Sequence, residues 1–170
     1  MGLPEQERAA AERALVTTLL TRLPADPAGL CLGAYLPLRG EPDLLGVLAQ
    51  WVGSGGTVGL PVVVRADAAL EFGRWAPGMA VVLERFGVAR PEPFERVMPD
   101  LMVVPCVGFD ERCFRLGYGG GYYDRTLAEH PCRAIGVAYD GCEIARFEAG
   151  EHDIALAEIV TETRLLRPPR

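Results

Sequence analysis

Four glycines stand within five residues of one segment, and charged and aromatic side chains flank them. The glycines are Gly117, Gly119, Gly120 and Gly121. Without side chains, the backbone N–H groups of a loop can approach a ligand closely. The helix predicted over residues 122–129 adds the positive end of its dipole at the same place. The segment therefore predicts an anion site, and phosphate is the usual occupant of such a site.

Two arginines and one carboxylate extend this chemistry. Arg115 and Arg125 bracket the glycines, and each guanidinium can donate two hydrogen bonds to a phosphate. Asp124 can help to hold Mg²⁺, which binds one or two carboxylates beside phosphate oxygens. Many glycine-rich turns between a strand and a helix are only tight turns, and the spacing here is not the dinucleotide-binding fingerprint. On these residues alone, phosphate binding and a bare turn both stay open.

The composition of the 170-residue chain narrows the possible functions. All 17 basic residues are arginines, which excludes a Walker A loop and a Schiff-base lysine on this chain. The net charge of −6 argues against nucleic acid or an anionic membrane as the main partner. Five cysteines without a C-x-x-C pair argue against a zinc site. No segment resembles a signal peptide or a membrane span, so we expect a cytoplasmic protein.

The hydrophobic pattern predicts the elements that must position these residues. We expect helices over residues 5–23, 44–51 and 122–129, and strands over residues 29–36, 57–64, 69–75, 100–105, 133–139 and 157–161. We expect a wrapped connection over residues 76–99, a long loop over residues 107–121 and a frayed tail over residues 164–170. Apolar strands that alternate with helices indicate a parallel sheet that is covered on both faces. We therefore predict one α/β domain over residues 1–170. It is Rossmann-like, with a mainly parallel sheet, helices on both faces and a site at the strand carboxyl ends.

The run over residues 109–125 resembles the signature of the 5-formyltetrahydrofolate cyclo-ligase family, also called methenyltetrahydrofolate synthetases. Residues 115–124, RLGYGGGYYD, are similar to the bacterial form of that signature throughout. Further pieces that resemble the family follow in order: residues 35–37 with Glu41, 60–62, 70–72 with Trp75, 86–88, 136–140, 152–153 and 160–162. The similarity extends over most of the chain.

The resemblance implies an ATP- and Mg²⁺-dependent enzyme that converts 5-formyltetrahydrofolate to 5,10-methenyltetrahydrofolate and releases ADP and phosphate. In the implied mechanism, the formyl oxygen takes the γ-phosphoryl group, N10 attacks the activated carbon, and ring closure expels phosphate. Phosphoryl transfer depends on positioning and charge neutralisation more than on a protein nucleophile, so a chain without lysine can catalyse it. We expect a monomer whose partner is the small folate substrate.

The resemblance also implies roles for individual residues. The ATP-binding residues would be Arg115, Leu116, Gly117, Tyr118, Gly119, Gly120, Gly121, Tyr122 and Tyr123. The folate-binding residues would be Leu36, Glu41, Trp75, Tyr118, Gly119, Gly120, Gly121 and Tyr122. Asp124 and Asp153 would hold Mg²⁺, and Arg115 and Tyr122 would be the catalytic residues.

Structural alternatives exist for several of these residues. Leu36 and Trp75 can belong to the core only, and Tyr123 can pack beneath the glycine loop. Asp153 can cap a helix. Asp110, which precedes the loop, can brace it rather than touch a substrate.

Two features depart from the family pattern. Family members usually carry a further N-terminal basic helix whose Lys and Arg contact ATP, and this sequence starts at what resembles the second helix. Cys113 stands where glycine is usual, so the backbone there either needs no positive φ or is strained. A non-catalytic folate- or nucleotide-binding paralogue is therefore one alternative. A kinase-like enzyme for another carboxylic or formylated small molecule is a second.

Overall fold

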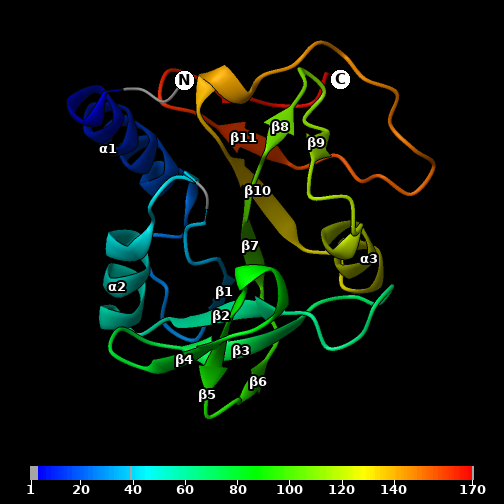
Figure 1. Cartoon of the computed structure of the whole chain (residues 1–170). Coiled ribbons are helices and arrows are strands. Elements are labelled where there is room, and N and C mark those ends of the chain that lie inside the picture. Colours follow the sequence, from blue (N-terminus) through cyan, green and yellow to red (C-terminus); the bar gives the residue numbers. More distant parts are fainter. Residues whose placement is uncertain (1–3, 39, 170) are drawn as a thin grey trace.

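The computed structural model describes residues 4–38 and 40–169. Within them, one sheet has eight strands in the order β12-β11-β10-β7-β1-β2-β3-β6 (Figure 1). Its centre is parallel and consists of β1 (Cys31–Gly33), β2 (Thr57–Val62), β7 (Leu101–Pro105), β10 (Arg133–Val137) and β11 (Glu158–Val160). Antiparallel strands flank this centre, namely β3 (Glu71–Trp75), β6 (Arg96–Val97) and β12 (Leu165–Leu166). The predicted α/β class with a mainly parallel sheet is confirmed.

Helices cover both faces of the sheet, as predicted. Helices α1 (Glu5–Arg22) and α2 (Leu45–Gly53) lie on one side in Figure 1, and α3 (Tyr122–Glu129) lies on the other. Helix α1 buries Leu15 and Leu19, which are four residues apart and therefore share one helical face. No helix in the described part of the chain is long and apolar enough to cross a bilayer.

Strand β7 shows how the sheet divides the interior. Leu101 and Val103 pack into a core cluster with α1 and α2. Met102 and Val104 pack into a second cluster that includes Leu127 of α3. This alternation follows from the two-residue period of a strand, and because both faces are buried the strand reads as a continuous apolar run.

A buried carboxylate at the start of β11 links α1, β10 and the C-terminal segment. The Glu158 side chain, only 3% exposed, pairs with Arg22 of α1 at 3.0 Å, with Arg133 of β10 and with Arg167 beyond β12 at 3.4 Å. Burial raises the pKa of Glu158, but hydrogen bonds from Arg22 and Arg133 outweigh it and hold the pKa below its usual value. Glu158 therefore ties helix α1 and the C-terminal segment to the sheet.

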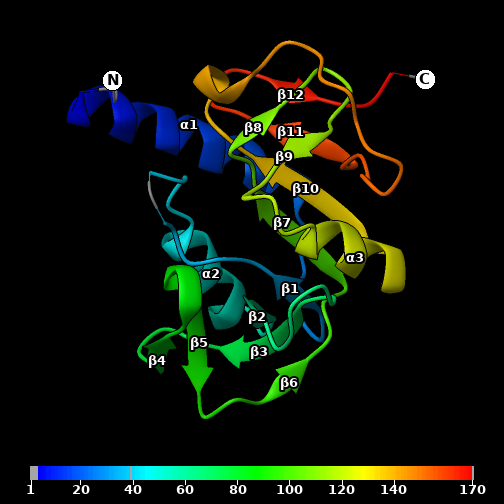
Figure 2. The same ribbon diagram turned by 45° about the vertical axis from the view of Figure 1, so that its right-hand side comes forward.

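Three segments are more regular than predicted. Residues 76–99 contain a separate ribbon of β4 (Ala80–Leu83) and β5 (Ala89–Glu92), with a 3₁₀ turn η1 (Arg85–Gly87) between them (Figure 2). All four β4 residues are exposed, and β5 contains Pro91, so neither strand has the pattern of a buried one. Within the predicted frayed tail, residues 165–166 form β12 and pair with β11, whereas Arg170 lies outside the described residues. The predicted long loop over residues 107–121 contains a hairpin of β8 (Gly108–Phe109) and β9 (Arg115–Leu116).

Candidate functional site

The hairpin that follows β7 presents the glycine loop. Its turn forms around Asp110, which is fully buried and whose carboxylate accepts the N–H groups of Arg112 at 2.9 Å and Phe114 at 3.4 Å. Asp110 therefore braces the turn, which is the structural alternative stated for it above. Cys113 is buried and its φ is +62°, so this position needs a positive φ and its backbone is strained, which is the second of the two options stated above.

Three of the four loop glycines meet a steric demand, and the fourth leaves open space. Gly119, with φ +90°, and Gly121, with φ +65°, adopt the left-handed conformation that glycine accepts without cost. A Cβ atom on Gly120 would lie 2.5 Å from the ring of Tyr122. A Cβ atom on Gly117 would meet nothing within 4 Å, so the loop is open there. The loop thus turns sharply into α3, whose N-cap residue is Gly121.

The predicted phosphate-binding arginine pairs with a predicted metal ligand. Nη1 of Arg115 donates to Oδ1 of Asp124 at 3.0 Å, and the two side chains are only 6% and 14% exposed. The Arg115 guanidinium also lies over the ring of Tyr123, 5.3 Å from its centroid. Tyr123 packs against the core cluster on the α3 side of the sheet, and burial raises the pKa of its phenol well above the usual value. Tyr123 therefore supports Arg115 from beneath.

The second predicted metal ligand lies on a neighbouring segment. Asp124 Oδ1 also accepts the backbone N–H of Ile154 at 3.0 Å, which places the residue after Asp153 against the start of α3. Asp153 is exposed and closes a turn by accepting the N–H of Gly150 at 2.8 Å. In the described part of the chain, no helix begins at or after Asp153, so the helix-cap alternative is wrong.

These carboxylates suit a partly hydrated ion. The hydrogen bonds of Asp124 in the described part of the chain both go to Oδ1, which leaves Oδ2 for a cation. The described residues contain no group of three or more His, Cys, Asp or Glu that could hold a metal ion. Asp124 and Asp153 therefore fit Mg²⁺ only if phosphate oxygens and water complete its shell, which is the usual arrangement for this ion.

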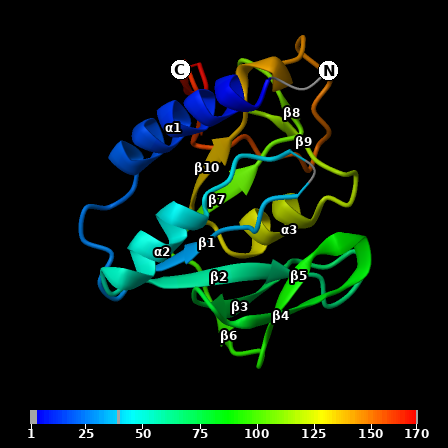
Figure 3. The ribbon, with the colours of Figure 1, turned by 60° about the vertical axis from the view of Figure 1, so that its left-hand side comes forward.

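The loop after β1 reaches the glycine loop from the other side (Figure 3). Glu41 accepts the N–H of Leu38 at 2.8 Å and the hydroxyl of Tyr118 at 3.3 Å. Tyr35 fixes the base of this loop because its buried hydroxyl donates to the carbonyl of Pro42 at 2.8 Å. Leu36 is half-buried and packs against the α1–α2 core cluster. Two of the predicted folate residues, Glu41 and Tyr118, are thus brought together.

Trp75 is not brought to this site. Strand β3 runs antiparallel to β2, so its last residue, Trp75, lies opposite Val58 near the start of β2. Trp75 is therefore at the opposite end of the strands from the site. Its side chain is 7% exposed and belongs to the α1–α2 core cluster. The geometry therefore supports the alternative that Trp75 is a core aromatic residue, and it gives no support to the predicted folate contact.

Arg125 lies beside the glycine loop, as predicted, but it pairs with a residue that the sequence did not indicate. Its guanidinium lies over the ring of Tyr122, 5.4 Å from the centroid, and its Nη2 donates to Asp67 at 3.3 Å. Nη1 is buried and has no hydrogen-bond partner among the described residues. Asp67 is an exposed residue in the loop between β2 and β3. Its only signal in the sequence was a turn-forming residue type, which does not point to a role.

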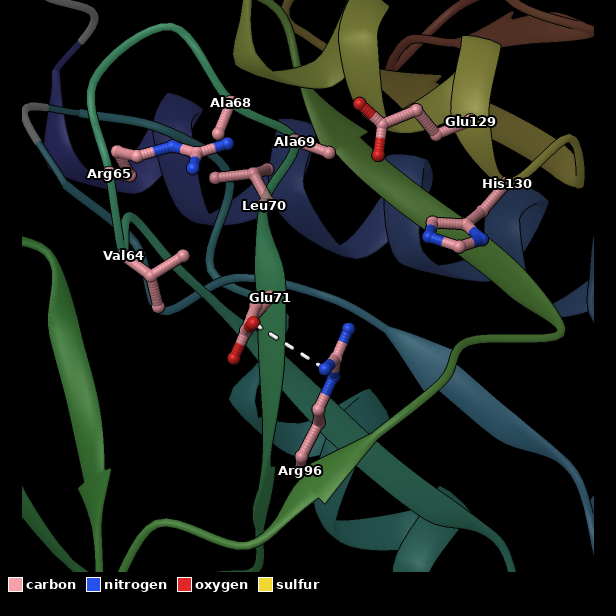
Figure 4. Close-up of a pocket in the computed structure, with 9 residues that line it drawn as sticks. All are labelled: Val64, Arg65, Ala68, Ala69, Leu70, Glu71, Arg96, Glu129 and His130. Carbon is pink, nitrogen blue, oxygen red and sulfur yellow. Dashed lines mark ion pairs between the residues drawn. The ribbon is translucent and has the colours of Figure 1, made fainter.

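A hollow beside the end of α3 lies apart from the predicted site residues (Figure 4). It measures about 280 Å³ and is lined by residues of the loop between β2 and β3, by Glu129 and His130, and by the ion pair of Glu71 and Arg96 at 3.5 Å. None of the predicted site residues lines it. The candidate site is instead an assembly of loops at the strand ends.

Comparison with known proteins places the chain in a family. The model of the 5-formyltetrahydrofolate cyclo-ligase family matches residues 3–162. A cyclo-ligase of Escherichia coli strain K12 is 32% identical over 171 residues, covering 95% of this chain and 93% of that protein. One of Mycolicibacterium smegmatis is 34% identical over 149 residues, covering 81% and 76%.

Solved structures agree with this result. The structure of a 5,10-methenyltetrahydrofolate synthetase from Aquifex aeolicus superposes with a TM-score of 0.79 at 31% identity, covering 97% of this chain and 84% of that one. A synthetase from Mycoplasma pneumoniae, at 22% identity and a TM-score of 0.74, shows the same fold. The predicted family and enzyme class are thereby confirmed: this chain belongs to the 5-formyltetrahydrofolate cyclo-ligase family.

Proposed function

We propose that this chain converts 5-formyltetrahydrofolate to 5,10-methenyltetrahydrofolate with consumption of ATP in the presence of Mg²⁺. Family membership supports the overall reaction. The observation that carries the ATP dependence is the buried pair of Arg115 and Asp124 beside the glycine loop. In this pair, a guanidinium that can bind phosphate lies next to a carboxylate that can bind a metal ion, at the point where the loop enters α3.

The glycine loop and two arginines would hold the ATP phosphates. The open loop at Gly117 leaves room for phosphate oxygens near the backbone. Arg115 would contact the transferred γ-phosphoryl group, where it neutralises developing charge. An unsatisfied buried donor costs about 1–3 kcal/mol. A phosphate oxygen at Nη1 of Arg125 would remove that cost, which supports a second phosphate contact at this residue.

Asp124 and Asp153 would hold the ion through Asp124 Oδ2 and the exposed Asp153 carboxylate. When bound, Mg²⁺ neutralises negative charge on the phosphates. Asp124 keeps Arg115 in place through its other oxygen, so the two functions of this carboxylate do not compete.

The folate would lie between the loop after β1 and the glycine loop. Glu41 is suited to accept hydrogen bonds from the amino group and ring N–H of the pterin. Its contact with Tyr118 brings that subsite beside the phosphate-binding backbone. The formyl oxygen and the γ-phosphoryl group must meet there, and Tyr122 at the start of α3 borders the same place. Closure of the ring by N10 is intramolecular, so the protein has to orient the substrate rather than supply a nucleophile.

The decisive experiment mixes the chain with 5-formyltetrahydrofolate and Mg-ATP and follows the methenyl product by its absorbance, with ATP omitted as the control. We expect ATP-dependent product. Arg115→Ala should raise the KM for ATP more than the KM for folate, and Asp124→Asn should raise the Mg²⁺ concentration needed for half-maximal rate. Folate binding without any ATP-dependent product would refute this proposal and favour a binding-only paralogue.

A further inference from the structure

Arg112 connects two segments that both reach the candidate site. Within the hairpin, Nε of Arg112 donates to Oδ2 of the buried Asp110 at 3.0 Å, and Nη2 donates to the same oxygen. Nη2 also donates to the backbone carbonyl of Phe147 at 2.6 Å. The guanidinium lies over the rings of Phe114 and Phe147, with centroid distances of 4.9 and 6.0 Å. One side chain thus holds the hairpin turn and a distant backbone position together.

The distant position belongs to residues 143–156, the segment that swings outward after β10 (Figure 1). Backbone hydrogen bonds fix its two ends to the hairpin, from Ile144 to Phe109 and from Leu156 to Cys113, each at 2.9 Å. Between these ends the chain is mostly exposed. Among the described residues, Arg112 makes the only side-chain hydrogen bond from the hairpin to this segment.

Residues 143–156 include one proposed metal ligand and a contact to the other. Asp153 lies in the C-terminal part of the segment, and the N–H of the next residue, Ile154, donates to Asp124. The same Asp124 oxygen holds Arg115. A shift of the segment would therefore move one proposed metal ligand directly and would remove a hydrogen bond from the other.

We propose that Arg112 is a positioning residue for the metal and phosphate half of the site. By holding the Phe147 carbonyl on the hairpin, it keeps the segment that carries Asp153 in place and keeps the Ile154 N–H on Asp124. This inference rests on the proposed function and adds a residue that touches neither substrate. Its effect should fall on Mg-ATP, because the folate subsite at Glu41 and Tyr118 belongs to other segments.

Arg112→Lys is the informative substitution. It keeps a positive charge beside Asp110, so the buried carboxylate is not left without a partner. A single ammonium group lacks the planar fork that reaches both Asp110 and Phe147, so the link to the outer segment is lost. Arg22→Lys is the matched control, because Arg22 also pairs with a buried carboxylate but lies on α1, away from the site.

Two measurements distinguish positioning from a general loss of stability. Hydrogen exchange should show faster exchange over residues 148–154 in Arg112→Lys and not in Arg22→Lys. Steady-state kinetics should show a KM for Mg-ATP raised about tenfold, which corresponds to about 1.4 kcal/mol, and a KM for folate within about twofold of wild type. The Mg²⁺ concentration for half-maximal rate should rise in parallel.

Faster exchange with both KM values unchanged would overturn the inference, and so would equal effects of the two substitutions. If the wild-type chain itself gives no ATP-dependent product, the proposed function fails and exchange alone decides about Arg112. In that case, wild-type exchange rates over residues 148–154 in Arg112→Lys would show that Arg112 does not position the segment.

Discussion

Replacing Gly120 with alanine should damage catalysis while the fold survives. The added Cβ atom would lie 2.5 Å from the Tyr122 ring, whereas ordinary contacts are 3.4–4 Å. The ring must therefore move by about 1 Å, and it can do so because Tyr122 is not fully buried. A displacement of about 1 Å in a substrate-positioning group costs up to about 100-fold in rate. The stability cost should stay near the lower end of the range of about 1–3 kcal/mol for overpacking.

The assay for Gly120→Ala is the formation of methenyl product, together with thermal unfolding followed by circular dichroism. The matched control is Gly46→Ala in helix α2, where a Cβ atom meets nothing within 4 Å. That control should keep wild-type kinetics and a Tm at or slightly above that of wild type, because Gly46 lies in the first turn of α2 and alanine has the higher helix propensity. Wild-type kcat and KM values in Gly120→Ala would show that the Tyr122 ring does not need its present position, and the steric argument would be wrong.

Three further predictions concern other parts of the molecule. Glu158→Gln should destabilise the fold by about 2–3 kcal/mol and lower the Tm by about 5–10 °C at pH 7, because three partly exposed arginines lose a buried partner. Because the folded-state pKa of Glu158 lies below the unfolded value, this stabilisation is present above about pH 4.3 and is lost as the pH falls further, so Tm values of variant and wild type should converge in acid. At position 113, Cys113→Gly should be more stable in urea titrations than Cys113→Ala, the reverse of the usual order, because φ is +62° there. Glu41→Gln should raise the KM for folate about 10- to 100-fold and leave the KM for ATP unchanged, since a charged acceptor contributes about 1.5–3 kcal/mol; equal changes in both KM values would contradict the assigned subsite.

The hydrophobic pattern predicted the central elements because burial on both faces leaves a strong signal. Strand β7 is apolar throughout, and α3 begins at Tyr122 as expected. The ribbon of β4 and β5 carried no such signal, since β4 is exposed at every position and β5 contains a proline. Strand β12 was missed because two residues are too few to show a period, and residues 161–164, which connect it to β11, contain no Gly, Pro, Asn or Asp to signal a hairpin turn.

The site could be predicted where it is local in sequence. The glycine loop, Arg115 and Asp124 lie within ten residues, and the structure keeps them together. Trp75 could not be placed, because the direction of β3 decides at which end of the strands this residue lies. The contact of Ile154 with Asp124 uses a backbone N–H group, which every residue except proline carries, so no residue type pointed to it.

The alternation along β7 means that the two halves of the interior are separated by the sheet's own backbone. Leu19 belongs to the half beneath α1 and α2, and Leu127 belongs to the half beneath α3, next to the glycine loop. Free-energy changes at well-separated sites without shared contacts usually add to within about 0.5 kcal/mol. The α1–α2 half can therefore be repacked without changing the packing beneath α3 and the glycine loop, provided that Tyr35 and Leu36, which support the loop after β1, are kept. Within that limit, it is the place to build a more heat-resistant protein.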